Sequence, residues 1–187
     1  MEHFQSRNLY DWFSANPGTA AQAVQVGRQA VAALAAAHQQ SIVHRDIKPA
    51  NVLMNDAGLV KVIDFGLAKA CAKKEYLALS TSGCILGTPN YMSPEQVSSP
   101  ADIDHRVDIY ALGAVLYFCL TGRPPYVGKS AFLLLQQIGT PFPKPSSLRP
   151  DIPPTLEAIV QKATHRDREC RYQNVAELGA ALAGLTI

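Results

Sequence analysis

The stretch HRDIKPANVLMNDAGLVKVIDFG, residues 44–66, decides the fold of this chain. Within it, two short apolar runs at 52–54 and 59–63 are separated by Asn-Asp-Ala-Gly, a combination that is typical of a hairpin turn. Acidic and amide residues stand before the first run and directly after the second. The two strands therefore place two acids and an amide at their ends, where the chain can hold them close together.

Helical patterns surround this hairpin. Upstream, a capping-box pattern made by Thr19 and Gln22 precedes the alanine-rich segment 20–37, which predicts a long central helix. Residues 66–96 show no clear period, and so long a connection is usually functional or disordered. The fold that follows is mainly α with a short β-hairpin. Further helices are predicted where apolar residues recur at helical spacing, at 104–120, 129–138, 155–164 and 174–182.

Composition limits the class of protein. The chain has 187 residues, 48% of them hydrophobic, which is enough for one globular domain with its own core. Its 17 Lys and Arg against 15 Asp and Glu exclude nucleic-acid binding through bulk charge. Four scattered cysteines without a C-x-x-C pair indicate a reducing, cytoplasmic environment. The longest apolar stretch, 109–120, is shorter than the roughly 20 residues that cross a bilayer, so no membrane segment is expected.

The polar groups around the hairpin match the needs of phosphoryl transfer. A carboxylate must accept the proton of an attacking hydroxyl, a cation must offset charge on the phosphoryl group, and oxygen ligands must hold magnesium. Asp46 and Lys48 suit the first two tasks. Asn51 and Asp64 suit the third.

Five motifs in order make the chain resemble the protein kinase family, and in style its bacterial serine/threonine members. The first two are H-R-D-x-x-x-x-N at 44–51 and D-F-G at 64–66. GTPNYMSPE at 87–95 is similar to the end of an activation segment, with Ser93 where the family usually has Ala. DIYALGAVLY at 108–117 and RECRYQNVAEL at 168–178 complete the series.

The resemblance implies a fold and a division of the chain. The fold is the C-terminal, large lobe of the kinase-like α+β fold. Segment 1–8 corresponds to the hinge between lobes, 9–187 to the C-terminal lobe and 64–95 to the activation segment.

The resemblance also implies catalytic and metal-binding roles. Asp46 is the expected catalytic base and Lys48 the expected contact of the γ-phosphate. Asn51 and Asp64 are the expected ligands of Mg²⁺ or Mn²⁺. The nucleotide is ATP, and its adenosine is expected to contact residues of the hinge and the hairpin, namely Glu2, Phe4, Asn8 and Leu53.

Regulatory roles fall on the activation segment and its neighbour. Thr88 corresponds to the position that contacts the base and shapes the acceptor site of a protein substrate carrying Ser or Thr. Arg45 before the catalytic acid is typical of kinases that are regulated by activation-loop phosphorylation, because the guanidinium can pair with a phosphate. Ser80 and Ser82 are the expected phosphorylation sites.

Structural roles are implied for five further residues. His44 is expected to pack under Phe65, and Glu95 to form an ion pair with Arg171. Asp108 is expected to hold the backbone of the catalytic loop. Outside the motifs, His38 ends the long helix and is expected to complement the charge of its C-terminus.

The family pattern starts before this sequence does. Residues 1–43 contain no G-x-G-x-x-G loop, no V-A-I-K lysine and no αC glutamate. We therefore expect the upper lobe to be missing, through a reading frame called from an internal Met or through a truncated gene. Leu9, Leu53 and Phe65 are then expected to be exposed.

Two functions of different class remain open. The first is a serine/threonine kinase fragment that transfers the γ-phosphate of ATP when an upper lobe is present and is inactive or very weak alone. The second is a non-catalytic, pseudokinase-like interaction module. The intact set Asp46, Lys48, Asn51 and Asp64 favours the first, because a settled binding module does not need all four.

Overall fold

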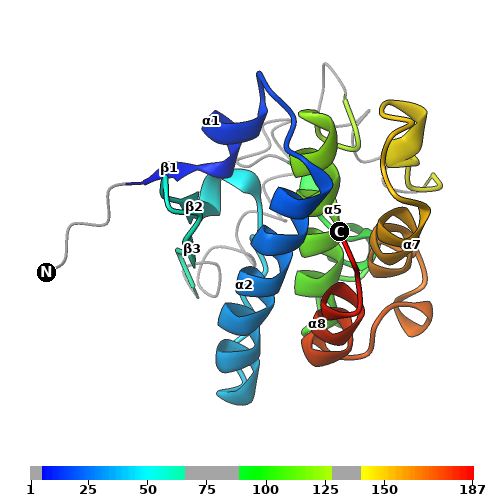
Figure 1. The fold of residues 1–187 in the computed structure, drawn as a ribbon. Helices are drawn as coiled ribbons and strands as arrows, with labels where there is room; N and C mark the ends of the chain where they lie inside the picture. Colours follow the sequence, from blue (N-terminus) through cyan, green and yellow to red (C-terminus); the bar gives the residue numbers. More distant parts are fainter. Residues whose placement is uncertain (1–5, 66–88, 128–139) are drawn as a thin grey trace, which may run out of the picture.

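The computed structural model describes residues 6–65, 89–127 and 140–187, and Figure 1 shows their arrangement. A helical body carries a small three-stranded sheet on one side (Figure 1). The helices are α1 (Leu9–Phe13), α2 (Ala20–Gln39), α4 (Pro94–Ser98), α5 (Arg106–Thr121), α7 (Pro154–Ala163) and α8 (Val175–Ala183). The strands are β1 (Arg7–Asn8), β2 (Val52–Met54) and β3 (Val60–Val62), and short 3-10 turns lie at η1 (Pro49–Asn51), η2 (Pro89–Tyr91), η3 (Pro145–Ser147) and η4 (Arg168–Cys170).

Helix α5 is the centre of the body. All of its residues are buried, and their apolar side chains point in every direction around the helix, as expected of an element enclosed on all sides. α2 and α7 pack against it, and α8 packs against α2 (Figure 1).

Helix α2 confirms the long helix predicted from the alanine-rich segment. Its N-terminus has the predicted capping box, in which Thr19 and Gln22 each bond the other's backbone N–H. Small residues let α8 come close: a Cβ on Gly27 would lie 2.8 Å from Leu182, and one on Gly179 would lie 2.8 Å from Val31. This contact fixes the C-terminal helix on the body.

The predicted hairpin is confirmed, and a third strand joins it. Val52 pairs with Val62, and the turn closes through Asn55, whose Oδ1 accepts the N–H of Leu59 at 2.8 Å. Gly58 supplies a φ of 76°, which a β-carbon would strain. The third strand, β1, pairs antiparallel with β2. The sequence pattern did not predict β1.

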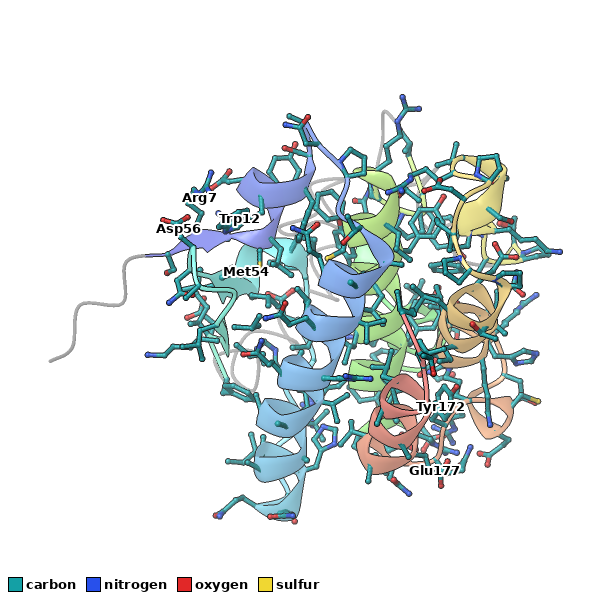
Figure 2. The ribbon with its side chains drawn as sticks, in the orientation of Figure 1. Arg7, Trp12, Met54, Asp56, Tyr172 and Glu177 are labelled. Carbon is teal, nitrogen blue, oxygen red and sulfur yellow. The ribbon has the colours of Figure 1, made fainter. Side chains whose placement is uncertain are left out.

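A side-chain cluster fixes β1 to the hairpin (Figure 2). The Arg7 guanidinium lies 3.9 Å from the centre of the Trp12 ring and 3.5 Å from the Asp56 carboxylate. Trp12 Nε1 donates to the Met54 carbonyl at 2.9 Å. Arg7 of β1 and Trp12 of α1 are therefore tied to β2 and to the turn that follows it.

The predicted helices are confirmed where the structure describes them. α5, α7 and α8 each begin and end within two residues of the predicted bounds. The helix predicted at 129–138 lies outside the described residues. Within the described ranges, none of the helices has both the length and the apolar character required to cross a membrane.

Candidate active site

Asp46 is the centre of a cluster of polar side chains in the loop before β2. Lys48 Nζ donates to Asp46 Oδ2 at 2.7 Å, and Asn51 Nδ2 donates to the same oxygen at 3.0 Å. Asn51 Nδ2 also bonds the Asp46 backbone carbonyl at 2.9 Å. The Asp46 side chain remains 47% exposed, so its carboxylate is open to an incoming group.

Asp108 on α5 holds the backbone of this loop. Its two carboxylate oxygens accept the N–H of His44 at 2.9 Å and that of Arg45 at 2.8 Å. Arg45 has a φ of 68°, a left-handed conformation that costs a non-glycine residue about 1–2 kcal/mol. Hydrogen bonds from backbone N–H groups to a buried carboxylate are strong enough to offset that strain.

His38 is a further partner of Asp108. Its Nε2 lies 2.8 Å from Asp108 Oδ2. The centre of the His105 ring lies 5.5 Å from the centre of the His38 ring, in an edge-to-face arrangement. Our expectation that His38 merely complements the end of α2 missed this contact. The only sequence signal was a histidine in the last helical turn before the catalytic loop.

At the open end of the hairpin, where β2 begins and β3 ends, lie the predicted metal ligands Asn51 and Asp64. The Ile63 N–H donates to the Asn51 carbonyl at 3.0 Å, and Asp64 follows directly with a φ of 64°. His44 Nδ1 accepts the Asp46 N–H at 3.3 Å, which assigns its proton to Nε2, the donor to the Ile63 carbonyl at 2.8 Å. The loop at 44–51 is therefore bonded to Ile63, the residue directly before the D-F-G motif.

The donor set at this end fits a hard divalent cation. Because Asn51 uses its Nδ2 for Asp46, its Oδ1 faces away from those bonds, and no hydrogen bond from a described residue reaches it. Asp64 is exposed and offers a carboxylate. Amide and carboxylate oxygens are the ligands that Mg²⁺ takes in proteins.

Phe65 lies against His44. The two rings are 4.8 Å apart in an edge-to-face arrangement, as the resemblance implied. Phe65 is 37% exposed and Leu53 is half-buried, in line with an uncovered surface. Leu9, in contrast, is fully buried, because α1 packs on α5 and η1 and leaves no open face at that position, so the expectation that Leu9 is exposed was wrong.

Glu95 and Arg171 form a buried ion pair. Arg171 Nη1 and Nη2 donate to Glu95 Oε1 and Oε2 at 2.6 and 2.8 Å, and the Arg171 side chain has no exposed surface. Arg171 also lies 4.9 Å from the centre of the Tyr110 ring. Burial raises the pKa of Tyr110 well above its usual value, so the ring remains neutral beside the cation.

Gln96 connects α4 to the catalytic loop, a contact that the sequence did not reveal. Its Nε2 donates to the Arg45 carbonyl at 2.9 Å. Its Oε1 accepts the N–H of Ser93 at 3.0 Å and the Ser93 hydroxyl at 3.2 Å. Ser93, which replaces the usual Ala of the motif, is thus fully buried with its hydroxyl satisfied.

The remaining predicted site residues divide into three groups. Arg45 is half-buried, and its Nε is buried without a hydrogen-bond partner in the described part of the chain. Asn8 pairs with Leu53 across the sheet, and its Oδ1 accepts the Asp11 N–H at 2.9 Å, which caps α1. The third group lies outside the described residues and comprises Glu2, Phe4, Ser80, Ser82 and Thr88.

Comparison with known proteins shows the family to which the chain is similar. The protein kinase domain matches residues 1–178. The chain is 39% identical over 184 residues to serine/threonine-protein kinase PknB of Mycobacterium leprae, covering 97% of the chain and 29% of that protein. It is 41% identical over 161 residues to PknB of Mycolicibacterium smegmatis, covering 86% of the chain and 25% of that protein.

A second kind of relative gives the same result. The chain is 39% identical over 163 residues to serine/threonine-protein kinase PknL of Mycobacterium tuberculosis, covering 87% of the chain and 40% of that protein. The chain therefore spans between 25% and 40% of the length of these relatives. With its motifs joined as described and a family match over nearly all of its residues, the chain belongs to the protein kinase family, where it is similar to bacterial serine/threonine kinases.

Proposed function

We propose that this chain supplies the C-terminal lobe of a serine/threonine protein kinase that transfers the γ-phosphate of ATP to a Ser or Thr hydroxyl. The observation that carries the proposal is the cluster in which Lys48 and Asn51 both bond one oxygen of an exposed Asp46 carboxylate. The names and family of the relatives support the same activity. In this proposal segment 1–8 is the hinge, 9–187 the lobe and 64–95 the activation segment.

Asp46 has the position and exposure of a general base. A carboxylate accepts the hydroxyl proton as the acceptor oxygen attacks, and its oxygens must be oriented beforehand. Lys48 and Asn51 orient it, since both bond Oδ2. Oδ1 receives neither of those two bonds and is the oxygen proposed to take the proton.

Lys48 and the pair Asn51 and Asp64 complete the proposed chemistry. Lys48 places a cation beside the base, where it can offset negative charge on the transferring group. Asn51 Oδ1 and the Asp64 carboxylate would hold Mg²⁺ or Mn²⁺. When bound, the metal neutralises charge on the phosphates of ATP.

Groups that cover the nucleotide must come from outside these 187 residues. The sequence has no G-x-G-x-x-G loop, and positioning supplies nearly all of kinase catalysis. We therefore propose that transfer requires an upper lobe and that the isolated chain is inactive or very weak. Residues around Thr88 and the activation-loop serines Ser80 and Ser82 are proposed to set acceptor choice and regulation.

Transfer of radiolabelled phosphate from ATP to a basic protein substrate tests the activity, with the protein joined to its upper lobe. Asp46→Asn is expected to lower kcat by a factor of about 10² to 10⁴, since it removes the base. Asp151→Asn is the matched control, because Asp151 lies on the surface in an ion pair with Arg149. Equal activity of the two variants would contradict the role of Asp46 as the base, and an absence of transfer by the unsubstituted protein would favour a non-catalytic interaction module.

A further inference from the structure

We propose that Gln96 is a positioning residue, which sets the orientation of the general base Asp46 through the backbone of the loop at 44–51. The inference rests on the proposed function, in which Asp46 accepts the hydroxyl proton. Gln96 lies in α4, directly after Glu95, where the proposed activation segment ends. It is only 4% exposed, so the two polar ends of its amide depend on partners within the protein.

The peptide unit that joins Arg45 to Asp46 is held at both of its polar groups. Its carbonyl, that of Arg45, accepts from Gln96 Nε2 at 2.9 Å. Its N–H, that of Asp46, donates to His44 Nδ1 at 3.3 Å. Because a peptide unit is planar, these two bonds fix the plane from which the Asp46 side chain departs. Of the two partners, His44 belongs to the loop itself and Gln96 comes from α4.

The backbone at Arg45 needs this support. Arg45 has a φ of 68°, and such a conformation persists only where the surroundings hold it. Asp108 accepts the Arg45 N–H at 2.8 Å, on the side of Arg45 away from Asp46. That bond does not restrain rotation about ψ of Arg45, which turns the next peptide unit. The bond from Gln96 restrains this rotation, so its loss loosens the base while Asp108 still anchors the loop.

The contacts of Gln96 show which end of its amide faces the loop. Its Oε1 accepts the Ser93 N–H at 3.0 Å and the Ser93 hydroxyl at 3.2 Å. A backbone N–H can only donate, so Oε1 belongs on the Ser93 side and Nε2 is left for the Arg45 carbonyl. Methionine in place of Gln96 makes neither contact. An ionised glutamate accepts from Ser93 but cannot donate to Arg45.

Gln29 on α2 offers a matched comparison. It also bonds backbone groups with both ends of its amide: Nε2 donates to the Gly58 carbonyl at 2.8 Å, and Oε1 accepts the Val60 N–H at 2.9 Å. These bonds hold the turn end of the hairpin, whereas Asp64 follows its open end. Loss of stability alone is therefore expected from either glutamine, but loss of positioning only from Gln96.

Hydrogen–deuterium exchange on the 187-residue chain tests the effect on the backbone. Gln96→Met is expected to speed exchange of the Asp46 amide at least about tenfold, because the peptide unit is no longer held toward His44. Gln29→Met is expected to change that rate by less than about twofold, since its bonds lie at a separate site. Unchanged exchange at Asp46 in Gln96→Met would overturn the proposal, whether or not the protein transfers phosphate.

Steady-state phosphate transfer by the protein joined to its upper lobe tests the effect on the reaction. Gln96→Met and Gln96→Glu are each expected to lower kcat by a factor of about 10 to 100, while KM for ATP changes less than about threefold. Gln29→Met is expected to change both constants by less than about twofold. Circular dichroism at the assay temperature shows whether each variant is folded.

The outcomes separate this inference from the proposed function. Equal losses of kcat in Gln96→Met and Gln29→Met, or a change in KM alone, would overturn the positioning role. If Asp46→Asn abolishes transfer and neither Gln96 variant lowers kcat, the positioning role fails and the proposed function stands. If the unsubstituted protein transfers no phosphate, both fail.

Discussion

The base and the tip of the loop at 44–51, held by Asp108 and carrying Asp46 respectively, are built in opposite ways. At the base, Asp108 is fully buried and accepts from two backbone N–H groups while it contacts His38. At the tip, the Asp46 side chain is 47% exposed, and its carboxylate accepts from Lys48 and Asn51 of the same loop. The carboxylate of Asp108 is used to hold the backbone, whereas that of Asp46 is open to solvent. Substitution of Asp108 is therefore expected to lower the free energy of unfolding more than substitution of Asp46.

Asp108→Ala is expected to have the largest effect on stability. Its removal leaves the N–H groups of His44 and Arg45 without their acceptor, and the free energy of unfolding is expected to fall by about 3–5 kcal/mol. Urea denaturation measures the change. Asp104→Ala is the control, two residues before the same helix begins: its partly exposed pair with Arg106 is expected to contribute about 1 kcal/mol. Similar losses of unfolding free energy in the two variants would contradict the role of Asp108 in holding the loop backbone.

Arg171→Met extends the comparison to the second buried ionic contact. It leaves Glu95 of α4 unpaired, and a loss of about 3 kcal/mol in the free energy of unfolding is expected. Arg168→Met removes a surface pair with Asp102 and is expected to cost at most about 1 kcal/mol. Urea denaturation measures both changes. A smaller loss of unfolding free energy for Arg171→Met than for Arg168→Met would contradict the expectation that the buried ion pair contributes more than the surface pair.

His38→Ala is expected to have an intermediate effect. It removes one contact of Asp108 but leaves both backbone donors in place, so a loss of about 1–2 kcal/mol is expected. His105→Ala serves as the control, because the His105 ring bonds the Gln173 carbonyl, whereas its bond with Asp108 joins two backbone groups that the substitution keeps. Thermal unfolding of both variants measures the difference in stability. A greater loss of stability for His105→Ala would show that His38 does not stabilise the loop through Asp108.

Asp46→Asn is expected to have the smallest effect on stability. The side chain is half exposed and keeps its shape, so the free energy of unfolding is expected to change by less than about 1 kcal/mol. Urea denaturation checks this on the same protein that is assayed for phosphate transfer. A loss as large as that of Asp108→Ala would mean that Asp46 supports the fold and would erase the contrast between tip and base.

Local patterns predicted most of the fold. The capping box of α2, the turn at 55–58 and the helical spacing of α5 all act over a few residues, so the sequence carries them directly. β1 escaped prediction because a strand of two residues has no period of its own. Its existence depends on the neighbouring β2, which lies far away in the sequence.

The candidate site was predictable to the extent that its members lie in one motif. Asp46, Lys48 and Asn51 fall within six residues, and the motif indicates their proximity. The bond from His38 to Asp108 spans 70 residues, and that from Gln96 to Arg45 spans 51. Such contacts are set by the packing of α2, α4 and α5, which no local pattern in this sequence encodes.

The pairing of β1 with β2 links residues near the N-terminal end of the described chain mechanically to the loop at 44–51. Arg7 and Asn8 are bonded to Met54 and Leu53, and Asn51 precedes that strand directly. The Trp12 and Asp56 contacts of Arg7 keep this joint from sliding. A pull on the chain at Arg7 is therefore borne first by β2, the strand that directly follows the proposed metal ligand Asn51, and only afterwards by the helices.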